Sequence, residues 1–516
     1  MGVLKIRGRR FFTVSSHGHH IRDSYDYARL LQLSSGRRIL HQIHAQILAA
    51  GLHQNPFLSA KLVSRYADLG SPSMADARNV FDLVPHRDAV LYNVIIRGYA
   101  AAAPPAEAVA IYAQMLSSGN IRPNFYTFTF VLKAIAAAGG WKVGRAVHSH
   151  VVKSGAGLDL FINNALIVFY AKCGRVETAR KVFDEMPTRD LVSWNSMISA
   201  YAQNECAYKA LELLHAMLPE KEPDYVTFVS ALPACAAMAA VREGMWIHSY
   251  VLSSGIEVDA VLGSGLIEMY ANCGRLSVAR NVFDRITEKN VILCNSMIKA
   301  LGIHGQASEA LQVFEEMETV GIKPDSICFV SILSACSHAG MVEKGFEIFE
   351  KMDTKHGVEK LQVHYACMVD TLGRSGELTR ATEFIEKMPL EPGRDVLGAL
   401  FGACRAHDNV ELGQEAARRL FLLDPENAGR YVAMAKMYQD SGRQEEMARM
   451  RKLMRDKGVR KLLGCSIVEV AAKAHTFGVE DGAHPMSNEI YAVLERLQKM
   501  VDEEENFSAN KNSSHW

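Results

Sequence analysis

The chain carries its apolar residues at helical spacing, in pairs of short segments separated by turn residues. In one such pair, Leu166, Phe169 and Tyr170 would lie on one face of a first helix. A second stripe follows with the same period, formed by Val176, Ala179, Val182, Phe183 and Met186. Gly174 between the stripes suits the left-handed position that ends a helix, and Pro187 ends the second helix because it lacks an amide hydrogen. The pattern therefore predicts a helical hairpin.

This hairpin pattern repeats along the chain. Residues 163–203 return at 263–303, an offset of 100 residues, and a more divergent copy lies at 59–100. Within each copy the hairpins are 31 or about 35 residues long. Because one such hairpin cannot bury its apolar stripe alone, neighbouring hairpins must stack. The sequence predicts an all-α, right-handed superhelical solenoid of helix-turn-helix repeats, whose first helices line the concave face.

Composition narrows the classes of partner. The 516 residues contain 57 Lys plus Arg and 57 Asp plus Glu, so no global basic field attracts nucleic acid and any such contact must be local. No run of 18 apolar residues occurs, so we expect no membrane-spanning helix. The 10 cysteines are never spaced C-x-x-C and several recur at repeat spacing. We interpret them as small buried apolar residues in a reducing compartment.

The first 23 residues are basic up to Asp23. Their cations are Lys5, Arg7, Arg9, Arg10 and Arg22, interspersed with aromatic and hydroxyl residues. This composition is typical of an organellar transit peptide, and its arginine density favours a mitochondrion over a chloroplast. A disordered basic tail is the alternative.

Two stretches of the repeat carry a family resemblance. VSWNSMISAY at 192–201 and YAKCGRVETARKVFDEMP at 170–187 resemble the pentatricopeptide repeats of land plants, in the PLS subclass of long, short and standard repeats. The resemblance covers roughly residues 24–505. It implies an array of about ten repeats at 24–393, tetratricopeptide-like E hairpins at 394–461, an E-plus-like extension at 462–505 and a disordered tail at 506–516.

In that family each repeat reads one base of single-stranded RNA through its fifth and its last residue. The pairs implied here are Asn93 with Asn124, Asn164 with Asp190, Asn195 with Asp224, Ser264 with Asn290, and Asn295 with Asp325. An Asn–Asp pair suits uracil, because the amide can donate to a ring carbonyl and the carboxylate can accept from the N3 hydrogen. Ser264 with Asn290 resembles the family's adenine pair, and Asn93 with Asn124 should accept either pyrimidine.

The resemblance also assigns base-stacking roles to apolar residues at the second position of the repeats, namely Val90, Phe161, Val192, Val261 and Ile292. The implied RNA then reads 5′ pyrimidine, any, U, U, any, A, U, any 3′. A single helical asparagine is usually a cap or a solvated side chain. Four asparagines in one register, at positions 93, 164, 195 and 295, favour a function instead.

No motif of an active site is present. A zinc deaminase of the related DYW class would need H-x-E followed by C-x-x-C, and neither occurs. The H-E-x-x-H, G-x-x-x-x-G-K and G-x-S-x-G motifs are also absent. We therefore expect no enzymatic activity, no cofactor and no metal. The segment from Gly464 resembles an E-plus tail, but Leu463 stands where the family usually has proline and Ile467 where it has tryptophan, which removes a docking ring.

Three functions compete. The resemblance implies a site-recognition factor for organellar C-to-U RNA editing, which would recruit a DYW-type deaminase in trans together with editing-complex helper proteins. The altered tail favours a factor for RNA splicing, stability or translation. A tetratricopeptide-like protein-binding scaffold is the third reading, and the registered Asn and Asp pairs speak against it.

Overall fold

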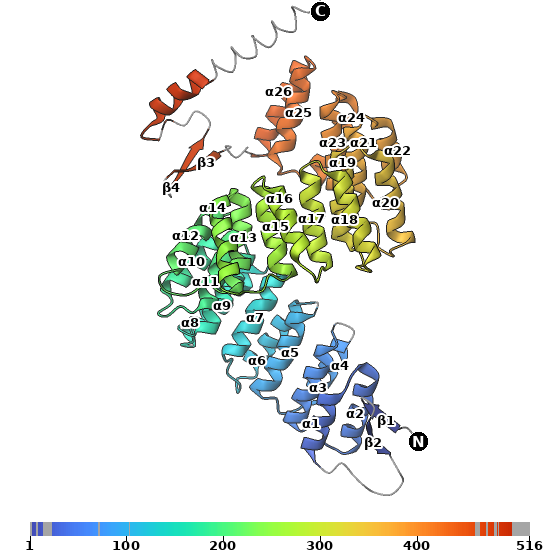
Figure 1. Ribbon diagram of the computed structural model, residues 1–516. Helices are drawn as coiled ribbons and strands as arrows, with labels where there is room; N and C mark the ends of the chain where they lie inside the picture. The colour runs from blue at the N-terminus through green and yellow to red at the C-terminus, as the bar shows by residue number, and fades with distance from the viewer. Residues whose placement is uncertain are drawn as a thin grey trace, which may run out of the picture. The chain divides into compact units, whose positions relative to one another are not determined.

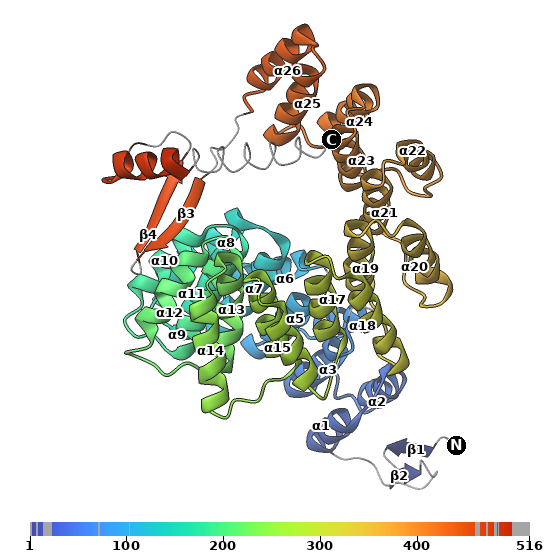
Figure 2. The same cartoon turned by 45° about the horizontal axis from the view of Figure 1, so that its top comes forward.

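The computed structural model consists of helical hairpins stacked in chain order within two compact units, Met1–Glu288 and Lys289–Trp516 (Figures 1 and 2). The structure describes residues 3–6, 9–13, 23–70, 73–102, 104–459, 465–470, 473–478, 482 and 484–497. Each unit is considered by itself.

The first unit contains β1 (Val3–Ile6), β2 (Arg9–Thr13), α1 (Ser24–Leu33), α2 (Arg37–Ala49), α3 (Pro56–Asp68), α4 (Met74–Leu83), α5 (Ala89–Ala101), α6 (Ala106–Ser117), α7 (Phe125–Ala138), α8 (Trp141–Lys153), α9 (Leu160–Lys172), α10 (Val176–Glu185), α11 (Leu191–Gln203), α12 (Ala207–Met217), α13 (Tyr225–Met238), α14 (Val241–Ser253), α15 (Ala260–Asn272) and α16 (Leu276–Arg285).

The second unit contains α17 (Val291–Ile303), α18 (Ala307–Thr319), α19 (Ser326–His338), α20 (Val342–Thr354), α21 (Gln362–Arg374), α22 (Leu378–Glu386), α23 (Arg394–Ala406), α24 (Val410–Leu423), α25 (Ala428–Asp440), α26 (Gln444–Asp456), β3 (Cys465–Val470) and β4 (Lys473–Gly478), followed by helical residues 487–497.

The predicted all-α solenoid is confirmed. In the first unit each odd-numbered helix from α1 to α15 packs against the next odd-numbered helix and against its own even-numbered partner; α17 to α23 repeat this in the second unit. The structure adds two antiparallel strand pairs that the helical periodicity did not predict, β1–β2 and β3–β4. The first pair lies within the segment assigned to a transit peptide, and the second within the E-plus-like extension.

Side-chain caps fix where the first helices begin. An Asp or Asn side chain accepts the amide hydrogen of the second or third helical residue at the start of every first helix from α5 to α19. These eight caps are Asp88, Asn124, Asp159, Asp190, Asp224, Asp259, Asn290 and Asp325. Gly174 closes the hairpin of α9 and α10 with φ 67°, as its position in the sequence predicts.

Close packing joins successive hairpins. A Cβ atom on Gly144 would lie only 2.0 Å from the Phe169 ring, and one on Gly244 only 2.2 Å from the Met269 sulfur. Only glycine therefore lets α8 and α14 approach the next first helix this closely.

Histidine–tyrosine pairs join the same helices. His148 Nδ1 lies 2.8 Å from the Tyr170 hydroxyl, and His248 Nδ1 lies 2.9 Å from that of Tyr270. His44 makes a similar contact with Tyr66 at 3.1 Å. Each pair links a second helix to the first helix of the next hairpin.

The cysteines whose side chains are described are all free thiols, and the majority are buried: Cys235, Cys294, Cys328, Cys336 and Cys404. Burial raises the pKa of the Cys235 thiol to about 12, and the nearby Glu243 carboxylate adds to this rise. These cysteines pack as apolar residues, as the sequence predicts. Among the described helices, none is long and apolar enough to cross a membrane.

Candidate nucleic-acid interface

The fifth residue of four first helices is an asparagine that lies almost completely inside the stack. Asn93, Asn164, Asn195 and Asn295 are 5–9% exposed. Each amide nitrogen donates to the side chain that caps the next first helix. The bonds run from Asn93 to Asn124 (3.0 Å), Asn164 to Asp190 (3.4 Å), Asn195 to Asp224 (3.0 Å) and Asn295 to Asp325 (3.0 Å). The structure thus brings together four of the five predicted pairs.

The fifth pair spans the two units. Ser264 in α15 donates its hydroxyl hydrogen to the Val261 carbonyl (2.7 Å). Asn290 caps α17 by accepting the Leu293 amide hydrogen (3.0 Å). The hydrogen bond of Ser264 therefore lies within α15, and that of Asn290 lies at the start of α17.

The capping carboxylates use one oxygen for the protein and leave the other available. All the hydrogen bonds that the structure describes for the carboxylates of Asp190, Asp224 and Asp325 go to Oδ1. This oxygen accepts the amide hydrogen of the third helical residue and the side-chain amide hydrogen of the preceding asparagine. Oδ2 thus remains as an acceptor at the helix end.

The carboxylates of Asp190 and Asp224 are ionised at neutral pH. Burial alone raises the pKa of Asp190, but hydrogen bonds from Ser193 and Asn164 outweigh it and lower the pKa below its usual value. Asp224 behaves alike, with burial opposed by hydrogen bonds from Thr227 and Asn195. Each Oδ2 is therefore part of a charged, strong acceptor.

An asparagine cap offers the opposite chemistry. Asn124 Oδ1 accepts from the Asn93 amide nitrogen and from the backbone of Thr127 (3.1 Å), and Asn290 Oδ1 accepts from Leu293. The free part of each side chain is then the Nδ2 donor. Asp and Asn caps at equivalent helix ends consequently present an acceptor and a donor, respectively.

Two buried threonines orient the amides of Asn93 and Asn195, and the sequence pattern did not predict them. Thr127 donates its hydroxyl hydrogen to Asn93 Oδ1 (2.6 Å), and Thr227 does the same to Asn195 Oδ1 (2.7 Å). Both threonines are completely buried. Each bond fixes which end of the amide faces the next cap. Their common place, the third residue of a long repeat after a standard repeat, is the signal that could have identified them.

The other two asparagines lack this support. Asn164 Oδ1 and Asn295 Oδ1 are buried and have no hydrogen-bond partner among the residues that the structure describes. In the repeat after Asn164, Ser193 directs its hydroxyl to Asp190 instead (2.7 Å). In the repeat after Asn295, the third residue is Cys328.

An exposed apolar ladder lies beside the caps, at the second residue of each first helix from α3 to α19. The five predicted stacking residues are 40–63% exposed, from Val261 to Phe161. The same position in other first helices is also apolar and exposed, in Phe57, Tyr126, Val226 and Ile327. The sequence did not predict these four residues, because their repeats have no assigned pair at the fifth and last positions. The ladder therefore runs through long repeats as well.

The ladder is widest at α7 and α9. The Phe125 ring lies 4.0 Å from the Tyr126 ring and 6.0 Å from the Phe161 ring, measured between centroids. All three side chains are exposed. They form an aromatic surface next to the Asn124 cap.

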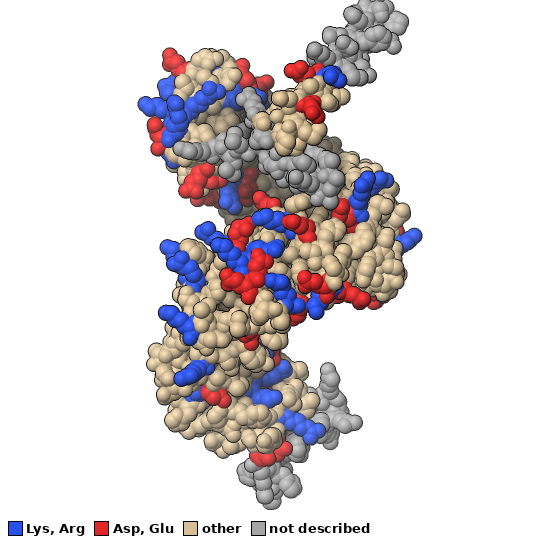
Figure 3. Space-filling model, turned by 90° about the vertical axis from the view of Figure 1, so that its left-hand side faces the viewer, with Lys and Arg blue, Asp and Glu red and all other residues tan. Residues whose placement is uncertain are grey.

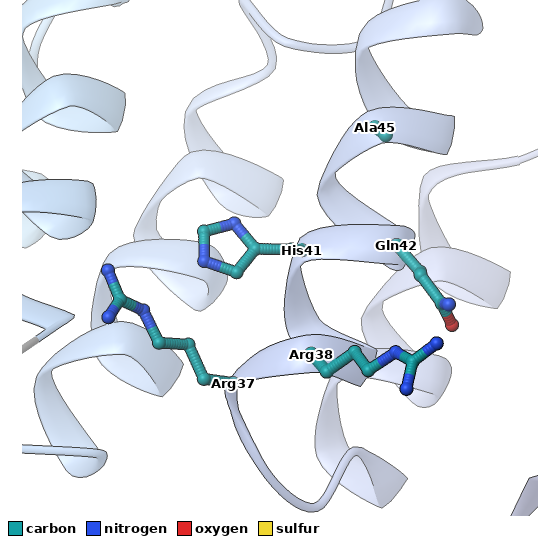
Figure 4. A pocket seen from close by; sticks show the side chains of 5 residues that line it. All are labelled: Arg37, Arg38, His41, Gln42 and Ala45. Carbon is teal, nitrogen blue, oxygen red and sulfur yellow. The ribbon is translucent and has the colours of Figure 1, made fainter.

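A shallow hollow of about 660 Å³ on α2 is lined by Arg37, Arg38, His41, Gln42 and Ala45 (Figure 4). The Arg37 guanidinium lies 2.9 Å and the His41 ring 3.3 Å from the Asp76 carboxylate. The Asp76 carboxylate thus compensates the charge of Arg37 in this hollow. Among the described residues, no three His, Cys, Asp or Glu side chains are grouped as metal ligands.

Only one of the two altered positions in the C-terminal tail lies among the described residues. Ile467 lies in β3, paired with Thr476 in the backbone register, and Leu463 lies outside the described residues.

Models of the pentatricopeptide repeat match residues 87–137, 164–191, 192–218, 264–291, 289–338 and 327–356. A model of the E motif matches residues 407–469, which include α24, α25 and α26.

Relatives in Arabidopsis thaliana match nearly the whole chain. The chain is 39% identical to the chloroplastic pentatricopeptide repeat-containing protein CRR2, over 90% of its own length and 71% of CRR2. It is 38% identical to a putative mitochondrial pentatricopeptide repeat-containing protein, over 90% of its length and 74% of that protein. Other relatives are longer, and the chain spans 55% of one of them.

The fold resembles that of the pentatricopeptide repeat protein PPR10, solved in complex with an 18-nt psaJ RNA element. The TM-score is 0.60 at 18% identity, over 85% of this chain and 70% of that one. A crystal structure of PPR10 from maize gives a TM-score of 0.53.

Proposed function

Because the chain belongs to the pentatricopeptide repeat family, we propose that it binds single-stranded RNA and selects its sequence with one reading pair per repeat. The observation that carries this proposal is the set of Asn–cap pairs, which recurs at one register beside the exposed apolar ladder. PPR10, which shares the fold, has been solved with RNA.

The hydrogen-bonding pattern of the caps suggests how a base is selected. An aspartate Oδ2 would accept the N3 hydrogen of uracil, while the second hydrogen of the asparagine amide would remain for a ring carbonyl. Cytosine has a lone pair at N3, which an aspartate repels and the Nδ2 donor of Asn124 suits. The side chains of the ladder would stack on the bases, contributing about 1–3 kcal/mol per base at aromatic positions.

We propose that RNA binding serves organellar C-to-U editing, with a DYW-type deaminase recruited in trans and helper proteins. The match of the E motif to residues 407–469 supports this role. The relatives include a chloroplastic and a mitochondrial protein, so an organelle is the expected compartment. The arginine-rich start of the chain favours a mitochondrion.

A role in RNA splicing, stability or translation is the second candidate. It rests on Leu463 and Ile467, which replace the residues usual in E-plus tails. A protein-binding scaffold gains nothing from the Asn–Asp pairs.

Sequencing organellar transcripts from plants that lack the protein tests these roles. Loss of editing at a cytidine shortly 3′ of a match to pyrimidine-any-U-U-any-A-U would support the editing role and identify the organelle. Unchanged editing at every cytidine would exclude it, and altered splicing or abundance of one transcript would favour the second candidate.

The substitution Asp224→Asn tests base selection directly. It exchanges the Oδ2 acceptor for a donor, so we expect binding to RNA with uracil at that position to fall roughly tenfold, about 1–2 kcal/mol, and binding to cytosine RNA to rise. Asp259→Asn is a matched control, because the fifth residue of its own repeat is Val229. Titrations with paired U and C oligonucleotides measure the effect; an equal loss on both RNAs would contradict the proposed reading.

A further inference from the structure

Helix α26 (Gln444–Asp456) has an apolar face and a basic face. Met447, Met450 and Met454 are spaced three and four residues apart and are partly buried, and α26 packs against α25. Arg449 and Lys452 lie on the side of the helix away from these methionines, Arg451 and Arg455 lie on its flank, and all four side chains are exposed. The basic face, defined by these four residues, is therefore directed to solvent.

The charge on this helix is concentrated. Residues 447–457, the later part of α26 and the residue after it, carry five cations and a single acid, Asp456, whereas Glu445 and Glu446 lie in the first turn. In the same unit α18 has the opposite balance, with Glu309, Glu315, Glu316 and Glu318 and no Lys or Arg. Figure 3 shows Lys and Arg side chains at the upper left, with Asp and Glu side chains among them. Basic and acidic side chains in this unit are thus distributed unequally between helices such as α26 and α18.

The cations of the basic face are largely available. Lys452 and Arg455 form no salt bridge with any residue that the structure describes, and the contact described for Arg451 is one weak hydrogen bond to Gln439 (3.4 Å). The Arg449 guanidinium lies 3.5 Å from Glu446 but stays 71% exposed. By contrast, Lys344 and Lys351 on α20 both contact Glu347, and Lys355 contacts Glu318.

We propose that the basic face of α26 binds the phosphate backbone of the RNA that lies 3′ of the bases read by the repeats. The inference rests on the proposed function, which places the 3′ end of the read segment at the last repeats before α23. Guanidinium and ammonium groups bind phosphate through charge-assisted hydrogen bonds, and side chains three and four residues apart lie about 5–6 Å from each other along a helix. Such a row can follow an extended strand without reading its bases.

The surroundings favour RNA over other anionic partners. A membrane-binding helix needs its apolar face free, whereas α26 packs against α25 and its three methionines are partly buried. A protein interface is usually depleted of charge at its centre and enriched in aromatic residues, and the basic face contains none. The reading pairs contribute aspartates, so neutralisation of phosphate must come from elsewhere in the chain.

The test compares the full-length protein with Arg451→Gln/Lys452→Gln/Arg455→Gln. The RNAs are a core oligonucleotide of the implied sequence, the core with a 3′ extension, and the core with a 5′ extension of equal length. We expect wild-type protein to gain affinity from the 3′ extension alone. The variant should lose that gain, roughly tenfold at low salt, and its salt dependence on 3′-extended RNA should become less steep by about 2 logarithmic units per decade of salt.

The control variant is Lys344→Gln/Lys351→Gln/Lys355→Gln. It removes the same number of positive charges from α20 and its C-cap residue, and it should retain the gain in affinity from the 3′ extension. Glutamine preserves the helix, and circular dichroism verifies it for each variant. Photocrosslinking from 4-thiouridine in the 3′ extension should map to residues 444–457.

A 3′ extension that adds no affinity, or a variant that keeps the gain, would overturn the inference. A variant with normal RNA binding that fails to retain an editing partner would also overturn it, in favour of a protein-binding face. Failure of wild-type protein to prefer the core over a scrambled core would instead reject the proposed function.

Discussion

Where the last residue of a repeat is an aspartate, as at Asp224, one capping carboxylate has two roles. Oδ1 of Asp224 accepts the Thr227 amide hydrogen (2.8 Å) that starts α13 and the amide hydrogen of Asn195 (3.0 Å). Because these bonds fix the plane of the carboxylate, the direction of Oδ2 is set before any ligand binds. Helix capping therefore orients the group that would select the base.

The reading pairs could be predicted from the sequence because their spacing repeats, as Asn164 and Asn195 show. Thr227 could not be predicted in the same way. A hydroxyl at the third helical residue normally completes a capping box, and Thr227 does so with Asp224. Its bond to Asn195, a residue of the preceding hairpin, depends on how two first helices pack, which local pattern does not specify.

Thr227→Val tests this bond with a side chain of the same shape. Asn195 Oδ1 would remain buried without a donor, so we expect a cost of about 1–2 kcal/mol in local stability. Amide hydrogen exchange in α11 and the first turn of α13 measures it. Thr129→Val removes a hydroxyl that bonds only within its own helix, to the Phe125 carbonyl, and should change exchange little. Equal protection in both variants would contradict the orienting role.

At the scale of elements, the helical hairpins follow from the apolar period. The apolar period does not predict the ladder in the long repeats, because the repeats of Tyr126 and Val226 have no strong pair at their fifth and last positions. It also does not predict the β3–β4 pair. That hairpin has six residues per strand, and a run as short as Cys465–Val470 carries too few positions to separate a strand from a helix.

The end of α13 contains a local strain that a substitution can relieve. Ala239 caps this helix in the left-handed conformation with φ 49°, where the equivalent residue after α7 is Gly139 with φ 67°. Because a Cβ is unfavourable in this conformation, we expect Ala239→Gly to stabilise the helix end by about 0.5–1 kcal/mol. Ala236→Gly, inside the same helix, should destabilise by about 1 kcal/mol. Thermal melting measures both, and a lower melting temperature for Ala239→Gly would reject the explanation.

At the scale of the whole molecule, stability depends on contacts repeated between neighbouring hairpins. Exposed ion pairs join several second helices, such as Glu177 with Lys209 (2.7 Å) and Glu343 with Arg380 (2.9 Å). Pairs of this kind contribute little, about 0–1 kcal/mol each, because water and salt screen them. The half-buried histidine–tyrosine contacts should therefore contribute more to the response of stability to pH.

These contacts predict a stability that falls in mild acid. Burial lowers the pKa of His44, His148 and His248, with a further lowering from His41 at the first and from Arg285 at the third. Asp76 at His44 and Glu185 at His148 oppose this shift but do not cancel it. The folded state thus binds fewer protons than the unfolded state just below the ordinary histidine pKa.

We therefore expect the melting temperature to be constant above about pH 7 and to decrease as the pH falls through about 6.5 towards 5.5, the window of unfolded histidine. Asp190 and Asp224, whose pKa values are lowered, begin to lose their contribution to stability only at a lower pH, so they do not affect the melting temperature in this window.

His148→Gln/His248→Gln separates these two residues from other groups. Glutamine can still bond to Tyr170 and Tyr270 but does not titrate, so the variant should show a smaller loss between neutral pH and about pH 5.5 than wild-type protein. Calorimetric melting at a series of pH values provides the comparison. A melting temperature that is equal or higher at the acidic end in wild-type protein would show that the folded state does not exclude these protons, and an identical pH dependence in the variant would assign the loss to other residues.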